Sequence, residues 1–252
     1  MSASTPNPEQ FRMGLMEHLR ELRKRLFICA LFVLVGACAS YSYAGMIFEL
    51  LCRPFFEAFP GSPLIGTAPA EAWFLKLKVS IFSGIILTAP ALFYQLWRFT
   101  APGLYSSEKR YVLPFVLLST LLFGCGAYFC YSMVLPLSLA FFFEEFKSIG
   151  VTPTIRLSDH LSMAVTTIVG FGAVFELPLL VLFLARAGAI THRTLIRYFR
   201  HAVVLIFIVA AVLTPPDVVS QCLMAGPLVL LYGISIGVAL LASRSTTAET
   251  AT

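Results

Sequence analysis

The stretch Leu161–Ala185, LSMAVTTIVGFGAVFELPLLVLFLA, constrains this chain most, because Glu176 is its only charged residue. A run this apolar can cross a bilayer, whose hydrocarbon core requires about 20 helical residues. A carboxyl group near its middle costs about 2–3 kcal/mol on insertion scales, so it usually faces a bundle interior or a wet cavity. Pro178 also frees backbone groups that a cavity or a neighbouring helix must satisfy. The sequence therefore predicts a membrane helix bundle shaped around Glu176.

The composition supports this prediction. The 252 residues are 58% hydrophobic and 12% charged, whereas a soluble domain carries about 25% charged residues. We therefore expect an all-α, polytopic membrane protein with a single domain over residues 1–252. The net charge of +5 lies in short basic clusters between apolar runs, which are typical of topology markers. No nucleic-acid partner is expected.

The apolar runs predict six transmembrane helices, with the last two short. The fifth run, Ala202–Leu213, would be roughly 18 Å long, well short of a ~30 Å core. A short hairpin implies local bilayer thinning or burial against neighbouring helices. The segments Glu49–Lys78 and Leu137–His160 are expected as two long loops. The expected spans are 26–48, 79–97, 111–136, 161–185, 200–214 and 218–243.

The segment Arg12–Arg25 precedes the first span. Its leucines recur at i, i+4 and i+7 on one helical face, which predicts an amphipathic helix at the membrane surface. Its charges are also compatible with a plain solvated face and a topology anchor.

The basic residues predict the orientation of the bundle. Thirteen lie in the N-terminal helix, in Arg98–Arg110, in Arg186–Arg200 and at Arg244, and only five lie in the alternate loops. Since cytoplasmic loops carry the excess of Lys and Arg, both termini are expected in the cytoplasm.

The sequence shows no pattern typical of an enzyme or a metal protein. Its four histidines lack HExxH spacing, there is no GxSxG motif, and its six cysteines form no CxxC pair. We expect no catalytic residues, no cofactor and no metal.

Two carboxylates on the cytoplasmic side suggest a binding site. Glu21 and Glu108 both lie among basic neighbours, which suits a preformed site for a positively charged ligand. A paired-guanidinium ligand would fit, because arginine makes bidentate contacts to carboxylates that lysine cannot copy. Ordinary surface salt bridges are the alternative.

From Met16 to Leu241 the chain resembles the TatC family, the multispanning receptor subunits of the twin-arginine protein translocase. Six segments carry the resemblance, in the same order and with the same six-span layout. They are His18–Leu26 (HLRELRKRL), Arg53–Phe55 (RPF), Ala68–Ser80 (APAEAWFLKLKVS), Ala89–Arg110 (APALFYQLWRFTAPGLYSSEKR), Phe171–Pro178 (FGAVFELP) and Leu213–Tyr232 (LTPPDVVSQCLMAGPLVLLY).

The resemblance implies binding of Arg-Arg signal peptides of folded proteins, partnership with TatA and TatB, and transport driven by the proton-motive force. It also implies a bacterial inner membrane and self-association in a multimeric receptor complex. By resemblance, several positions gain roles. Glu21 and Glu108 receive the arginine pair, Arg23, Gln95 and Phe99 support them, Pro54 is the outer-loop proline, and Glu176, Asp217 and Gln221 form intramembrane polar positions that meet a partner helix.

Other interpretations stay open at these positions. Glu176 could hydrogen-bond within its own bundle, Asp217 could cap the following helix, and Gln95 could be an interfacial anchor. The alternative function is a proton-coupled secondary transporter with Glu176 as the carrier, but neither a second charged partner nor an internal repeat is visible. An intramembrane hydrolase would need a buried nucleophile with a His or Asp partner.

Overall fold

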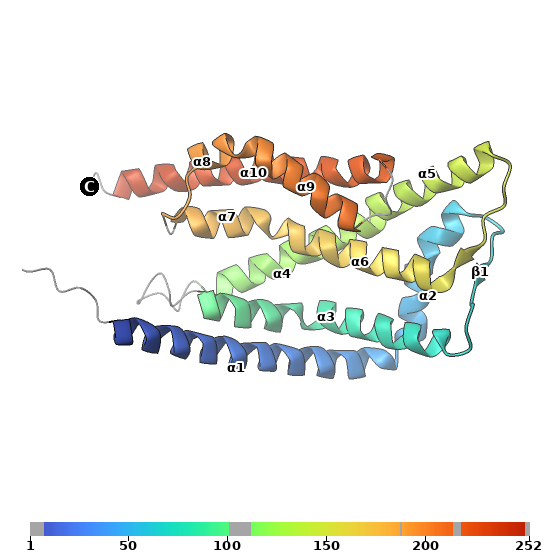
Figure 1. The fold of residues 1–252 in the computed structure, drawn as a ribbon, viewed down its shortest axis with the longest axis horizontal. Coiled ribbons are helices and arrows are strands. Elements are labelled where there is room, and N and C mark those ends of the chain that lie inside the picture. Colours follow the sequence, from blue (N-terminus) through green and yellow to red (C-terminus); the bar gives the residue numbers. More distant parts are fainter. Residues whose placement is uncertain (1–7, 101–111, 187, 214–217, 250–252) are drawn as a thin grey trace, which may run out of the picture.

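The chain folds into an almost entirely helical bundle in the computed structural model, which describes residues 8–100, 112–186, 188–213 and 218–249. The long helices run roughly along one axis (Figure 1). Three pairs pack together along the bundle: α1 (Pro8–Tyr41) with α3 (Glu71–Thr100), α4 (Val112–Phe129) with α6 (Leu157–Phe175), and α9 (Phe199–Leu213) with α10 (Val218–Glu249). The prediction of an all-α membrane fold is confirmed.

Among the described residues, four helical stretches are long and apolar enough to cross a bilayer, namely Glu71–Thr100, Val112–Ser148, Leu157–Arg186 and Gln221–Leu240. A fifth candidate is the pair Met16–Tyr41 and Ala44–Ala58, which is bent by 86°. Helix α9 has 15 residues, about 22 Å, and is the short apolar helix expected before the last span.

The first helix differs in its bounds from the predicted span 26–48. The amphipathic N-terminal segment is helical and continues into the apolar part of α1 without a break. The helix ends at Tyr41, and the chain turns into α2 (Ala44–Ala58). Residues 44–48, expected in the first span, therefore belong to α2, which lies at the end of the bundle (Figure 1).

The third helix is much longer than predicted. Helix α4 continues through one π-helical turn, η3 (Cys130–Val134), into α5 (Leu135–Ser148). The segment expected as a loop over 137–160 is therefore helical up to Ser148 and again from Leu157, and the loop expected over 49–78 is helical up to Ala58 and again from Glu71. Pro136 is the second residue of α5. The wider π turn just before it makes room for the proline ring, which would clash with the backbone of an ordinary helical turn.

The loops at this end form a cap over the bundle. Strand β1 (Leu64–Ile65) pairs in parallel with β2 (Ile155–Arg156), so that the two long connecting segments are joined. Below them, Phe55 and Phe59 of α2 pack against Leu135 and Leu139 of α5. The cap therefore fixes α2 and α5 relative to each other.

The predicted span 161–185 is not one regular helix. It breaks at Glu176, between α6 and α7 (Leu177–Arg186), and Pro178 occupies the second position of α7. Proline is tolerated there because backbone N–H groups of a first turn have no partner within the helix. The break thus places Glu176 at a helix junction, which periodicity alone did not predict.

Candidate functional site

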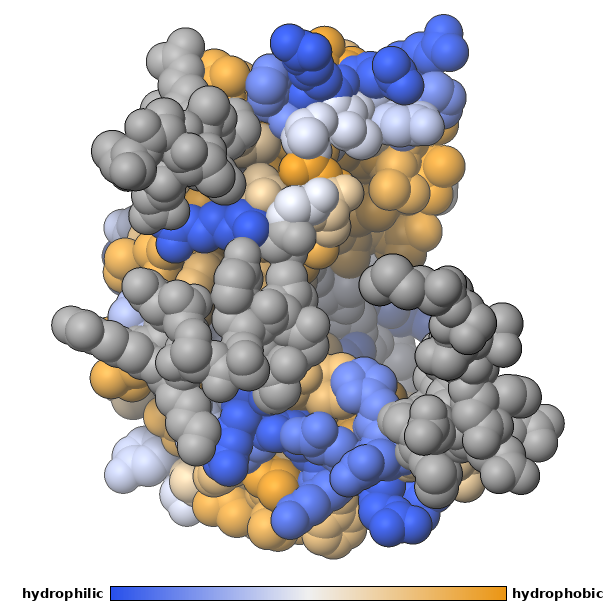
Figure 2. All heavy atoms as spheres, turned by 90° about the vertical axis from the view of Figure 1, so that its left-hand side faces the viewer, coloured by the Kyte–Doolittle hydropathy of each residue, from blue (hydrophilic) through white to orange (hydrophobic). Residues whose placement is uncertain are grey.

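Charged side chains of α1 and α3 form a groove at the end of the bundle opposite the cap. Figure 2 views this end and shows hydrophilic residues gathered at the bottom, where α1 and the end of α3 lie. The groove has a volume of about 540 Å³, and we call it the α1–α3 groove. Its lining residues are Glu17, Arg20, Glu21, Lys24, Arg25, Ile28, Gln95 and Arg98.

Glu21 and Gln95 are brought together through Arg25. The Nε atom of Arg25 donates a hydrogen bond to Oε1 of Glu21 at 3.0 Å, and its Nη2 atom contacts the same oxygen. Its Nη1 atom donates to Oε1 of Gln95 at 3.3 Å. One guanidinium therefore links a carboxylate of α1 to an amide of α3.

The surroundings keep the Glu21 carboxylate ionised. It lies in the polar part of α1, before the apolar stretch that begins at Leu26. The hydrogen bond from Arg25 lowers the pKa of Glu21, and the positive charges of Arg25 and Arg98 add to this effect. The Glu21 side chain is 40% exposed and Arg25 is 14% exposed. The carboxylate is thus charged and open to a ligand.

Aromatic contacts hold the end of α3 against α1. The rings of His18 and Phe99 stack with centroids 4.5 Å apart. Arg98 donates a hydrogen bond to the Tyr94 hydroxyl at 3.3 Å. The stacked rings join the parts of α1 and α3 that carry Glu21 and Gln95, and the hydrogen bond orients Arg98 within α3.

Several of the residues that the sequence predicted for a signal-peptide site gather here. Glu21 and Gln95 line the groove, and Phe99 supports it through His18. Arg23 is exposed on α1 and is not one of the described residues that line the groove. Glu108 lies outside the described residues. Sequence reasoning missed Glu17, Arg20 and Lys24 as lining residues, although their spacing places them on the helical face of Glu21.

The intramembrane carboxylate Glu176 lies against α4. Its Oε1 atom is buried and has no hydrogen-bond partner among the described residues. Ser119 and the backbone of Phe123 are its polar neighbours, and the Ser119 hydroxyl accepts a hydrogen bond from Nε1 of Trp97 at 2.7 Å. A buried carboxyl oxygen without a partner can receive a further donor.

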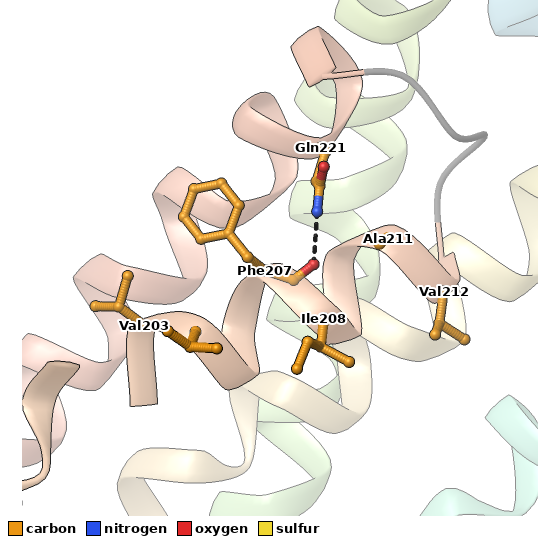
Figure 3. Close-up of a pocket in the computed structure, with 7 residues that line it drawn as sticks. Val203, Phe207, Ile208, Ala211, Val212 and Gln221 are labelled. Carbon is orange, nitrogen blue, oxygen red and sulfur yellow. Dashed lines mark hydrogen bonds between the residues drawn. The ribbon is translucent and has the colours of Figure 1, made fainter. Parts of the chain in front are cut away.

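Gln221 lies in a different place, at the groove between α9 and α10 shown in Figure 3. Its Nε2 atom donates a hydrogen bond to the Phe207 carbonyl at 2.8 Å. This α9–α10 groove has a volume of about 440 Å³ and is otherwise apolar, lined by Val203, Val204, Phe207, Ile208, Ala211 and Val212. Glu176 is not among these lining residues, and Asp217 lies outside the described residues.

Pro54 is a packing position. It is buried inside α2, next to Phe55, whose ring stacks on Phe59 at 4.9 Å and contacts His160 at 5.0 Å. Among the described residues there is no group of three His, Cys, Asp or Glu side chains placed to hold a metal ion.

Comparison with known proteins gives a consistent result. The family model for Sec-independent protein translocase protein (TatC) matches residues 17–227. A TatC of Aquifex aeolicus is 41% identical over 92% of this chain and 97% of its own length, and one of Helicobacter pylori is 42% identical over 89% and 87%. A crystal structure of the twin arginine translocase receptor TatC is 40% identical, with a TM-score of 0.83, and covers 90% of this chain and 100% of that one.

These similarities extend over nearly the whole chain, in sequence and in fold. They confirm the resemblance to the TatC family and the expectation that the chain is a protein-transport component rather than an enzyme. The chain belongs to the TatC family of Sec-independent protein translocase proteins.

Proposed function

We propose that the chain is a receptor that binds the Arg-Arg signal peptides of folded proteins in the α1–α3 groove. One observation carries the proposal: Glu21 is an ionised, half-exposed carboxylate that already binds a guanidinium in this groove. A solved relative is described as a twin arginine translocase receptor. The recognition chemistry follows from these contacts.

Arginine exchange is the proposed binding step. Arg25 contacts Oε1 of Glu21, and a carboxylate offers about four lone-pair sites on its two oxygens. A peptide arginine can therefore bind beside Arg25 or replace it. Glu108, which follows α3 in the sequence, is the proposed receptor for the second arginine.

Partner subunits are proposed to meet the bundle within the membrane. TatA and TatB each bring a transmembrane helix, and an apolar groove with one amide suits a helix with a single polar side chain. Gln221 in the α9–α10 groove and the unpaired oxygen of Glu176 are two such polar positions. We propose that Asp217 acts together with Gln221 in binding a partner helix. We also propose that the proton-motive force drives transport.

The proposed topology has six crossings with both termini in the cytoplasm of a bacterial inner membrane. The four long apolar stretches, α1 and the short α9 would supply the crossings. The end with the α1–α3 groove and the C-terminal part of α10 would then face the cytoplasm (Figure 1), as the excess of basic residues predicts.

Photo-crosslinking of a signal peptide tests the proposal. An Arg-Arg peptide is crosslinked to the wild-type protein in membranes together with TatA and TatB, and to Glu21→Gln and Glu108→Gln. Charge-assisted hydrogen bonds contribute about 1.5–3 kcal/mol, so each variant should lose roughly tenfold or more in affinity. A Lys-Lys peptide should bind the wild type as weakly as the Arg-Arg peptide binds the variants.

A matched control is available at the opposite end of the bundle. Glu57 forms an (i, i+4) ion pair with Arg53 at 2.9 Å, as Glu21 does with Arg25. Glu57→Gln should leave crosslinking unchanged. Undiminished crosslinking in both Glu21→Gln and Glu108→Gln would move the binding site away from this groove, and failure of the wild type to crosslink would contradict the receptor function.

A further inference from the structure

A second charged surface lies at the same end of the bundle, on the side opposite α1. It is centred on α8 (His192–Arg197) and the first turn of α9, and Figure 2 shows hydrophilic residues at the top of this end, where Figure 1 places α8. Arg193, Arg197 and Arg200 are all exposed. We call these three residues the α8 basic patch.

The sequence around the α8 basic patch contains no acidic residue. No Asp or Glu occurs between Glu176 and Asp217 in the sequence. Among the described side chains, none of the three arginines forms an ion pair, whereas Arg25, Arg53 and Lys147 each do. Within the part of the chain whose side chains are described, the patch therefore carries positive charge without an acidic partner.

Its backbone is held in place by α10. The Tyr232 hydroxyl donates a hydrogen bond to the Leu195 carbonyl at 3.0 Å, and its ring lies 5.9 Å from that of Phe199. The Thr191 side chain accepts a hydrogen bond from the backbone N–H of Thr194 at the start of α8. The arginines thus project from a fixed platform and not from a free loop.

Apolar side chains are interleaved with the charges. Ile196 is 57% exposed and Tyr198 is 52% exposed, and the surface continues along α9 with Leu205, which is 60% exposed and does not line the α9–α10 groove. Exposed aromatic and apolar residues beside basic ones are typical of the membrane interface. Because α9 is only about 22 Å long, it also draws the patch towards the hydrocarbon boundary.

We infer that the α8 basic patch binds the headgroup of an anionic phospholipid, with the acyl chains against the exposed apolar face of α9. The charges suit the phosphate, and the adjoining apolar face suits the chains, so one surface matches both halves of the same molecule. An acidic segment of a protein would use the charges but not the apolar face. The site is independent of signal-peptide binding.

Native mass spectrometry of the full chain tests this inference. The protein is extracted from nanodiscs of phosphatidylcholine and phosphatidylglycerol, and the lipids that remain bound are counted. Each surface basic residue contributes about fivefold to the attraction of anionic lipid. The variant Arg193→Gln/Arg197→Gln/Arg200→Gln should therefore bind phosphatidylglycerol at least about tenfold more weakly than the wild type.

Two control variants separate this site from general charge. Arg53→Gln/Lys147→Gln/Arg156→Gln removes as many charges at the capped end and should retain the lipid, as should the three patch arginines changed to lysine. Equal loss in both glutamine variants, or equal retention of the two lipids by the wild type, would overturn the inference. Displacement of phosphatidylglycerol by an equal concentration of inorganic phosphate would also overturn it, because the acyl chains would then play no part.

Discussion

At the scale of single residues, Arg25 is the informative side chain. It donates to Glu21 and to Gln95, and it is more buried than its carboxylate partner. It therefore presents to Glu21 the same group that an arginine of a signal peptide would present. Under the proposed function, Arg25 is an internal competitor that keeps the groove in its binding geometry until the peptide arrives.

Replacing Arg25 tests this competition. Arg25→Met keeps an unbranched apolar stem and removes the guanidinium donors, so Glu21 becomes fully available. Since partly exposed ion pairs are weak, the affinity for an Arg-Arg peptide should rise by up to about fivefold. The measurement is peptide crosslinking as a function of peptide concentration. Arg53→Met is the control, and an unchanged or lower affinity of Arg25→Met would show that Arg25 supports the site.

At the scale of helices, two glycines allow unusually close approach between neighbouring helices. A Cβ atom on Gly84 of α3 would lie 2.5 Å from the backbone nitrogen of Ala37 in α1. One on Gly172 of α6 would lie 2.6 Å from the Phe123 ring of α4. Small residues drive such contacts in membranes, because dispersion forces between closely packed backbones replace the hydrophobic effect.

The contact between α1 and α3 is expected to be intolerant of a methyl group. Gly84→Ala would push against backbone atoms, which cannot move aside as a flexible side chain does, and should destabilise the protein by about 1–3 kcal/mol. Thermal unfolding in detergent measures this. Gly124 of α4 has no neighbour within 4 Å of an added Cβ, so Gly124→Ala should leave the melting temperature unchanged or slightly raised. Equal melting temperatures of the two variants would contradict the proposed packing.

At the scale of the whole molecule, the two ends of the bundle differ in kind. One end carries the α1–α3 groove and the α8 basic patch, both built from side chains on helix ends. The other end is closed by α2, α5 and the paired strands β1 and β2. Glu71 ties this cap to the bundle, because it binds Thr67 and Ala68 before α3 and the backbone N–H of Ser158 in α6.

The cap should depend on the ionisation of Glu71, which precedes the apolar part of α3 that begins at Val79. Hydrogen bonds from the Thr67 backbone and the Ser158 side chain lower the pKa of Glu71 to about 2. Its stabilising effect is complete above the unfolded-state pKa of 4.5 and is lost as pH falls towards 2.

Glu71→Gln should therefore lower the melting temperature at neutral pH, and the difference from the wild type should shrink below pH 4.5. Melting temperatures of the two proteins across this range test the claim, and Glu144→Gln, on an exposed side chain at the same end, is the control. A difference that stays constant with pH would show that packing, and not charge, makes Glu71 important.

The candidate site could be predicted in part. Glu21 and Gln95 were identified from the sequence, because local patterns reveal both kinds of position. Glu21 is a charged residue in the helix before the first span, and Gln95 is a polar residue near the end of the second span. Glu17, Arg20 and Lys24 were missed as lining residues, because a groove is defined by the partner helix as well as by its own face. The sequence also could not predict that Glu176 and Gln221 lie at different places in the bundle, since both are isolated polar residues in apolar runs.

The sequence by itself determined that this is an apolar helical bundle with a short penultimate helix, because hydropathy and length are properties of local segments. Prolines such as Pro136 and Pro178 mark places where a helix can bend, but the tertiary structure decided where the helices bend and end. The chain turns after Tyr41 although apolar residues continue, α4 runs on through a π turn to Ser148, and Glu176 divides α6 from α7. A local pattern cannot decide these points, because backbone groups that a break frees within a membrane must find partners in neighbouring segments.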